Sequence, residues 1–266
     1  MVVGVLALGC IACPAAAERP ADKGWIQLGA HFPKIDSDMR IEDEDLFIGS
    51  TAIDLESDLD LDDRKAVPKV EAGIRLGKRF RLEADYFNVN RSESTTLSRT
   101  IVVDDHVFPV SIEVASSLKT RVYRLAAGYS FIRNQKAELG VAVGAHLSKV
   151  KARITANSLL PGDPAPRSEG RHEGAPLPNA GIYGSYALSR VFSIEGRIDA
   201  FKLKVGNYKG GLIDANLRIS ARMHRNIGVG VGYNYARYKL DVDKNSWNGT
   251  FKYNYSGPVT YIEFVF

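Results

Sequence analysis

The sequence predicts an all-β protein, namely a transmembrane, antiparallel, up-and-down β-barrel of about ten strands, with eight strands as the alternative. Three observations predict this fold class. Polar and apolar residues alternate with a period of two through most of the chain, as in strands with two unlike faces. The connections between these segments alternate between tight turns and long loops, and the chain begins with a stretch typical of an export signal.

The first residues, MVVGVLALGCIACPAAAERP, predict a signal peptide over 1–17. Its apolar core is followed by an A-x-A pattern formed by Ala15 and Ala17, and a buried N-terminal helix is the alternative. Cys10 and Cys13 both lie in this stretch. We therefore expect 18–266 to form one outer-membrane β-barrel domain that has no disulfide bond in an oxidising compartment.

Ten alternating segments are expected to form one strand each, because each reaches or exceeds the about 9–11 residues that a tilted strand needs to cross a bilayer. In the segment 118–131, for example, Tyr123 and Leu125 share one face, while Arg124 and Ala126 share the other. The ten segments are 25–34, 67–77, 80–90, 118–131, 137–154, 178–188, 191–204, 211–223, 227–242 and 250–266.

The tight turns are GKR, IRNQK, LSR and MHRN, and the longest loops are 35–66, 91–117 and 157–177. Short turns at one end and long loops at the other are typical of outer-membrane barrels, whose turns face the periplasm. An even number of strands places both termini on that side. A soluble sandwich also alternates, but the export signal, the alternating connection lengths and the aromatic residues near the strand ends favour the membrane barrel.

If the apolar face contacts lipid, the other face lines the lumen, and its charges nearly balance. The basic residues assigned to it are Lys69, Arg75, Arg81, Arg124, Arg197, Arg218 and Arg222. The acidic ones are Glu71, Glu83, Asp85, Glu138, Glu195, Asp199, Asp214 and Glu263. We expect ion pairs and hydrogen bonds to fill the lumen, because unpaired charges there are costly. A narrow path for an ion or solute is the alternative.

Glycines on the same face are expected to leave room for the long arginine and glutamate side chains opposite. They are Gly73, Gly128, Gly140, Gly144, Gly228, Gly230 and Gly232.

No catalytic, cofactor-binding or metal-binding residue is assigned from the sequence. The mature chain lacks H-E-x-x-H, G-x-S-x-G and C-x-x-C motifs. His146 and Ser148 share the inward face of one strand, whereas a lipid hydrolase would need both groups near the lipid surface together with a carboxylate. We therefore expect His146 to be a satisfied lumen histidine. His172, with Glu169 and Glu173 nearby, is expected to be solvated.

The loop over 36–66 is strongly acidic, and the default expectation is a solvated surface. Asp58, Asp60 and Asp62 have the spacing of the start of a calcium loop. Asp63 stands where that loop needs glycine, and Lys69 stands where it needs a bidentate glutamate, so an EF-hand is excluded. A looser divalent-ion site near lipopolysaccharide phosphates remains the alternative.

The sequence ends in VTYIEFVF, in which Ile262, Phe264 and Phe266 alternate. This terminus, the signal peptide and the strand rhythm resemble the small outer-membrane β-barrel proteins of Gram-negative bacteria, in the OmpA-like and OmpW-like group. The stretches IDLESDLDLDD, RLEADYFNVNR and YRLAAGYSF are similar to a set of proteobacterial barrels, and that similarity implies no activity. The resemblance implies outer-membrane localisation, contact with outer-membrane lipid and lipopolysaccharide, and recognition of the last strand by the barrel-assembly machinery.

The expected function is non-enzymatic, in envelope structure or in surface interaction through the long loops. The alternatives are a narrow channel for a small solute or ion and, second, an outer-membrane lipid A hydrolase or protease. A nucleic-acid partner is not expected, because the net charge of +4 arises from 35 basic and 31 acidic residues spread along the chain.

Overall fold

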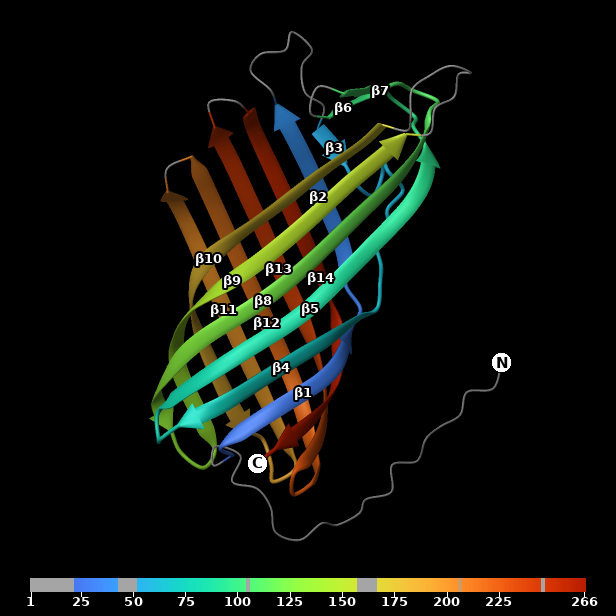
Figure 1. The fold of residues 1–266 in the computed structure, drawn as a ribbon. Coiled ribbons are helices and arrows are strands. Elements are labelled where there is room, and N and C mark those ends of the chain that lie inside the picture. Colours follow the sequence, from blue (N-terminus) through green and yellow to red (C-terminus); the bar gives the residue numbers. More distant parts are fainter. Residues whose placement is uncertain (1–21, 43–51, 104–105, 157–166, 206, 245–246) are drawn as a thin grey trace, which may run out of the picture.

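A computed structural model describes residues 22–42, 52–103, 106–156, 167–205, 207–244 and 247–266. Within them, ten strands close a ring in the order β1-β4-β5-β8-β9-β10-β11-β12-β13-β14, and β14 pairs again with β1 (Figure 1). Every pairing is antiparallel. The predicted ten-stranded barrel is therefore confirmed. The predicted signal peptide lies outside the described residues, and no helix long and apolar enough to cross a membrane occurs within them.

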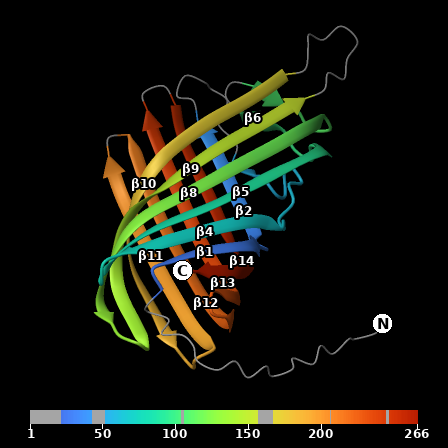
Figure 2. The same ribbon diagram turned by 60° about the horizontal axis from the view of Figure 1, so that its bottom comes forward.

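The ring strands are β1 (Gly24–His31), β4 (Val67–Leu76), β5 (Phe80–Thr96), β8 (Glu113–Arg133), β9 (Ala137–Ala156), β10 (Arg167–Ala187), β11 (Phe192–Val205), β12 (Tyr208–His224), β13 (Ile227–Lys244) and β14 (Trp247–Val265). Four further strands lie at one end of the barrel: β2 (Lys34–Glu42), β3 (Ala52–Asp54), β6 (Ile101–Val103) and β7 (His106–Phe108). Figure 2 shows β1 beside β14 where the ring closes.

The two ends of the barrel differ. At one end, here the turn end, the tight turns lie beside the start of β1 and the C-terminus (Figure 1). The backbone amides of Lys23 and Gly24 donate hydrogen bonds to the carbonyl of Phe266 at 2.8 and 2.9 Å, so the last residue is held by the first strand. The opposite end, here the loop end, carries β2, β3 and the β6–β7 hairpin. The start of β1 and the C-terminus thus both lie at the turn end, as predicted.

The outer wall carries an apolar band near the turn end, where large side chains face outward. Leu125 and Val143, for instance, expose 62% and 64% of their surface. The face polarity predicted for this band is confirmed, because Arg124 and Ala126, which alternate with these outward positions, are buried. A continuous exposed apolar band of this kind is the outer surface that a barrel presents to hydrocarbon.

The strands extend well beyond the predicted segments toward the loop end. The expected loops 91–117 and 157–177 are wrong in extent, because β5 continues to Thr96, β8 begins at Glu113 and β10 begins at Arg167. The physical reason is that the two faces exchange polarity between the apolar band and the loop end: there the apolar side chains point inward and the polar ones outward. In β8, Lys119 and Arg121 face outward while Leu118 and Val122 are buried, as in a barrel surrounded by water.

The wall near the loop end is not built by the ring strands alone. The chain leaves β1, passes Phe32 and Pro33, and continues as β2 along the upper half of β14, from Asn248 to Ser256. Because β4 begins only at Val67, the upper part of β5 has no strand on that side among the described residues. The segment 52–66 folds into this part of the barrel mouth.

Candidate functional site: a lumen filled in three layers

One layer of the lumen contains two arginines that share three carboxylates. Arg124 on β8 donates from Nε to Asp199 at 2.9 Å and from Nη1 to Glu83 and Asp85, each at 3.2 Å. Arg197 on β11 lies within 3.1 to 3.6 Å of the same three residues. All five side chains are buried. Alternation along each strand places them inward, and together they form a network in which charges of both signs are paired.

Two further clusters extend this charged layer toward the turn end. Arg75 donates to Glu138 from Nη1 and Nη2, each at 2.6 Å, and the Ser130 hydroxyl donates to the same carboxylate at 2.5 Å.

In the second cluster, Arg218 pairs with Glu71 and donates to the Gln27 side-chain oxygen at 2.6 Å. Gln27 in turn donates to Glu263 at 3.0 Å, which brings the C-terminal strand into the network. Side chains from opposite walls of the ring are thereby joined.

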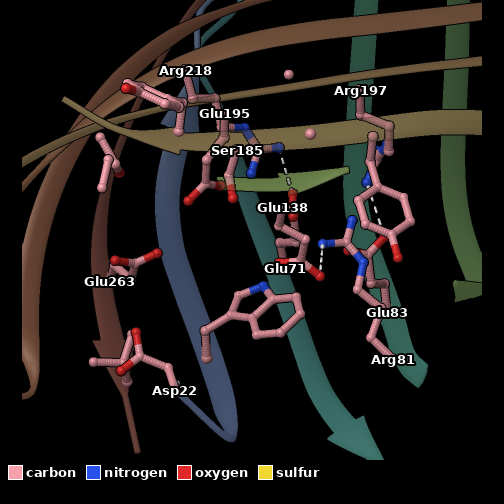
Figure 3. Close-up of a pocket in the computed structure, with 18 of the residues that line it drawn as sticks. Asp22, Glu71, Arg81, Glu83, Glu138, Ser185, Glu195, Arg197, Arg218 and Glu263 are labelled. Atoms are coloured by element: carbon pink, nitrogen blue, oxygen red, sulfur yellow. Dashed lines mark hydrogen bonds and ion pairs between the residues drawn. The ribbon is translucent and has the colours of Figure 1, made fainter. Parts of the chain in front are cut away.

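At the turn end the charged layer opens into a cavity of about 80 Å³ (Figure 3). Figure 3 shows Arg81 beside Glu83, and these two side chains form an ion pair at 2.7 Å. The Arg81 guanidinium stacks on the Tyr183 ring, 3.2 Å from its centroid. Among the lining residues, Arg75, Arg81, Lys136, Arg197, Arg218 and Arg222 face Asp22, Glu71, Glu83, Glu138, Glu195 and Glu263. The two signs are equal in number, so the cavity has no excess charge with which to attract an ion.

Above the charges lies a layer of aromatic rings. Tyr238 stacks on Tyr255 with ring centroids 6.0 Å apart, and Tyr253 packs against both. His146 is 2% exposed and its ring meets Tyr238 edge-on at 6.2 Å, so it faces inward as predicted. The expectation that it is fully satisfied is wrong, because its Nδ1 has no hydrogen-bond partner among the described residues. The side chain of Ser148 lies outside the described residues.

The third layer is an apolar plug at the loop end, to which the acidic segment contributes several leucines. Leu55, Leu59 and Leu61 alternate with acidic residues and are buried, together with Ile53, Leu97, Ile101, Phe108, Val114, Leu118, Ile154 and Ala156. The default expectation of a solvated acidic loop is therefore wrong for these leucines. They enter the mouth because the inner wall there is apolar, and burying them removes apolar surface from water.

A polar contact holds this plug to the wall. Arg91 on β5 is 1% exposed and is ion-paired with Glu56. It also donates to the Ser37 hydroxyl at 2.8 Å and to the Asp62 carbonyl at 3.2 Å. One arginine thus joins β5, β2 and the segment 52–66 across the part of the wall that lacks a strand. The same segment contacts Arg99 through Asp58. No group of three or more His, Cys, Asp or Glu residues that could hold a metal ion occurs in the described part of the chain.

The remaining predicted lumen residues also lie inward. Arg222 pairs with Asp22 at 2.7 Å, Asp214 accepts a hydrogen bond from the Tyr255 hydroxyl at 3.3 Å, and Lys69 is buried. Glu195 lines the turn-end cavity. The backbone of His172, Glu169 and Glu173 belongs to β10, and their side chains lie outside the described residues.

The inward glycines mainly make room for aromatic rings rather than for the arginines and glutamates that were expected there. A Cβ atom on Gly140 would lie 2.3 Å from the Tyr183 hydroxyl, and one on Gly230 would lie 2.2 Å from the Tyr261 ring. A Cβ atom on Gly73 would likewise overlap the Trp25 ring. Gly232 fits the expectation, since its Cβ would meet the Arg218 side chain at 2.8 Å.

Sequence reasoning missed Arg91, Glu56, Trp25 and Tyr183. Continuing the alternation from Phe87 and Val89 would have placed Arg91 inward.

The comparisons with known proteins agree with this geometry. The family described as "Outer membrane protein beta-barrel domain" matches residues 3–255. The chain therefore belongs to the outer-membrane β-barrel family, and its location is the cell outer membrane. The exposed apolar band is accordingly its lipid-facing surface. A search of curated proteins found no match.

Among solved structures, the outer membrane protease OmpT from Escherichia coli is 12% identical, covers 95% of this chain and 99% of its own, and has a TM-score of 0.59. The Pseudomonas putida toluene transporter TodX is 10% identical, with 95% and 92% covered and a TM-score of 0.35. The attachment invasion locus protein Ail of Yersinia pestis is 10% identical, with 90% and 98% covered and a TM-score of 0.30. At these identities the likeness to OmpT shows the fold alone.

Proposed function

We propose that this outer-membrane barrel is a closed, non-enzymatic protein that serves envelope structure or surface interaction through its loop end. One observation carries the proposal: the lumen is filled in series by a charged network, a layer of tyrosines and an apolar plug. An open pore would need a continuous polar path past all three layers.

The charged layer resists opening because its ion pairs are shared. Arg124 and Arg197 contact the same three carboxylates, so moving either guanidinium aside takes one partner from each of these buried carboxylates and leaves excess negative charge in the layer. Removing one partner of a buried pair costs about 3–5 kcal/mol. The plug adds a second barrier. Arg91 on β5 contacts both Glu56 of the plug and Ser37 on β2, so the plug is held to both strands that flank the gap in the wall.

The height of the barrel supports a role at the cell surface. β8 has 21 residues, which at about 3.3 Å each span roughly 70 Å along the strand. With a strand tilt of about 40°, the height along the barrel axis is roughly 50 Å. The apolar band of an outer-membrane barrel is about 25 Å tall, so the barrel is roughly twice as tall as its band. The loop end, including the β6–β7 hairpin, therefore stands outside the membrane, where a partner can reach it.

The chemistry of the lumen argues against catalysis. His146 is enclosed by the tyrosine layer. Of the carboxylates that act on it, Asp199 is bound to arginines and Asp214 accepts a hydrogen bond from the Tyr255 hydroxyl. No hydrolysable lipid can reach this histidine from the lipid-facing wall, because its side chain points into the lumen.

Planar-bilayer conductance of the full-length barrel tests the proposal. We expect no steady single-channel steps from the wild type or from Arg237→Ala, which removes an outward arginine and serves as the matched control. Steady wild-type steps that change in Arg124→Ala would overturn the closed lumen. Incubation with lipopolysaccharide or peptides tests the non-enzymatic part, and cleavage that disappears in His146→Ala would overturn it.

A further inference from the structure

A cluster of five basic side chains lies on the outer wall of β8 and β9, and we call it the basic patch. It consists of Lys119, Arg121, Lys149, Lys151 and Arg153, all of which face away from the lumen. The strand register sets Lys119 directly opposite Lys151 and Arg121 directly opposite Lys149. Like charges in directly opposed positions of a sheet repel each other and destabilise it. Anions bound at the patch, from the protein or from a ligand, would offset this repulsion.

The barrel does not supply these anions from the described residues. The outward positions of β5 that adjoin the patch are Asn88, opposite Arg121, and Asn90, opposite Lys119, and both are neutral. No described carboxylate forms an ion pair with any of the five cations.

Basic residues on the other side of the barrel differ in this respect. Lys239 and Lys252 are also opposed in register, but each has its own partner, at 3.0 Å from Asp241 and 3.8 Å from Asp38. Lys204 and Lys209 are opposed as well, and Asp241 on β13 lies directly opposite Lys209. The patch on β8 and β9 differs in its size and in having only Asn88 and Asn90 beside it on β5.

The height of the patch indicates what it meets. One step toward the turn end, β5, β8 and β9 carry Tyr86, Tyr123 and Leu147 in register, and the two tyrosine rings are 4.9 Å apart. Below them the outward side chains are those of the apolar band, such as Leu125 and Val143. Tyrosines mark the interface between hydrocarbon and headgroups. The patch therefore begins where the acyl chains end, on the side of the loops.

We propose that the basic patch binds the phosphate groups of an outer-leaflet lipid, namely a phosphorylated glycolipid such as lipopolysaccharide. Such a lipid would lay its acyl chains along the apolar band and bring its phosphates level with the opposed pairs. Arg121 and Arg153 can each donate two hydrogen bonds to one phosphate, whereas the three lysines act as point charges. The inference rests on the outer-membrane location and is independent of whether the lumen is closed.

The test uses the refolded full chain in neutral detergent micelles, with bis-phosphorylated lipid A as the probe and native mass spectrometry as the readout. The variant Lys119→Gln/Lys151→Gln removes one opposed pair. We expect it to lower affinity about tenfold, as loss of charge-assisted contacts to phosphate does. The matched control Lys239→Gln/Lys252→Gln removes the same charge from an opposed pair that already has carboxylate partners, and we expect unchanged affinity.

Three results would overturn the proposal. They are equal losses in the two double variants, equal binding of dephosphorylated lipid A by the wild type, and displacement of lipid A by equimolar inorganic phosphate, which would assign the patch to a free anion. Heat-dependent mobility on a denaturing gel shows that each variant is folded. A second variant, Arg121→Gln/Lys149→Gln, repeats the test on the other opposed pair and should show the same loss.

Discussion

The guanidinium of Arg124 on β8 donates a hydrogen bond from Nε to Asp199 on β11, 2.9 Å away, although β9 and β10 lie between these strands in the wall. The contact therefore crosses the lumen. Glu83 and Asp85 on β5 accept from the same arginine, so this one side chain joins three parts of the ring. Closure of the barrel and filling of its interior thus depend on the same residues.

Replacing Arg124 by alanine should destabilise the barrel by about 3–5 kcal/mol, because Asp199, Glu83 and Asp85 lose a shared buried partner. The urea midpoint of unfolding in detergent, followed by tryptophan fluorescence, measures the change. Arg237→Ala is the control, since Arg237 is exposed on the outer wall and should cost less than about 1 kcal/mol. Equal midpoints for the two variants would show that the network does not stabilise the fold.

Gly140→Ala should also destabilise the barrel, by about 1–3 kcal/mol, because the new Cβ would lie 2.3 Å from the Tyr183 hydroxyl. Moving that ring breaks its hydrogen bond with Ser130, which measures 2.9 Å. At Gly196, in contrast, the nearest atom would be 3.6 Å away, so Gly196→Ala should leave the same urea midpoint unchanged or slightly raised. A lowered midpoint in both variants would point to a general intolerance of alanine in these strands.

The lipid-facing part of the fold could be predicted from the sequence, since one rule governs it. In the apolar band every second residue meets hydrocarbon, so Tyr123 and Leu125 separate from Arg124 by alternation alone. The inward charges followed from the same rule. Their partners did not, because the contact of Arg124 with Asp199 depends on the curvature of the closed ring and not on the register of neighbouring strands.

The loop end could not be predicted in the same way, because its environment changes from lipid to water. There the inner wall becomes apolar and the outer wall polar, as at Leu118 and Lys119, and β8 extends back to Glu113, inside the stretch 91–117 where a loop is expected from the sequence. Leu55, Leu59 and Leu61 in a strongly acidic stretch were attributed to a solvated loop. Their burial depends on an apolar wall that distant strands supply, which local composition does not reveal.

Leu59→Ala should loosen the plug without unfolding the barrel. Leu59 is 1% exposed within the apolar cluster, and such truncations cost about 2–5 kcal/mol. Trypsin cleavage after Arg64 or Lys65 should become at least about tenfold faster, because local opening exposes the segment. Leu125→Ala, the same change on the lipid-facing wall, should leave the cleavage rate as in the wild type. Unchanged cleavage in Leu59→Ala would mean that the leucines do not hold the plug in place.

The start of the plug segment should open in acid, because Asp58 is held ionised by Arg99. The Arg99 Nε donates to Asp58 at 2.8 Å, and this hydrogen bond lowers the pKa of the Asp58 carboxyl below its ordinary value of 3.8. Since the folded pKa is the lower one, the stabilisation is complete above about pH 4 and is lost as pH falls through the folded pKa. The Asp54 amide, which donates to Asp58 at 2.9 Å, reports this opening through its hydrogen-exchange protection factor. We expect protection to fall below pH 3.8 in the wild type and to be low at every pH in Asp58→Asn, whereas an identical acid transition in both proteins would assign the opening to another carboxylate.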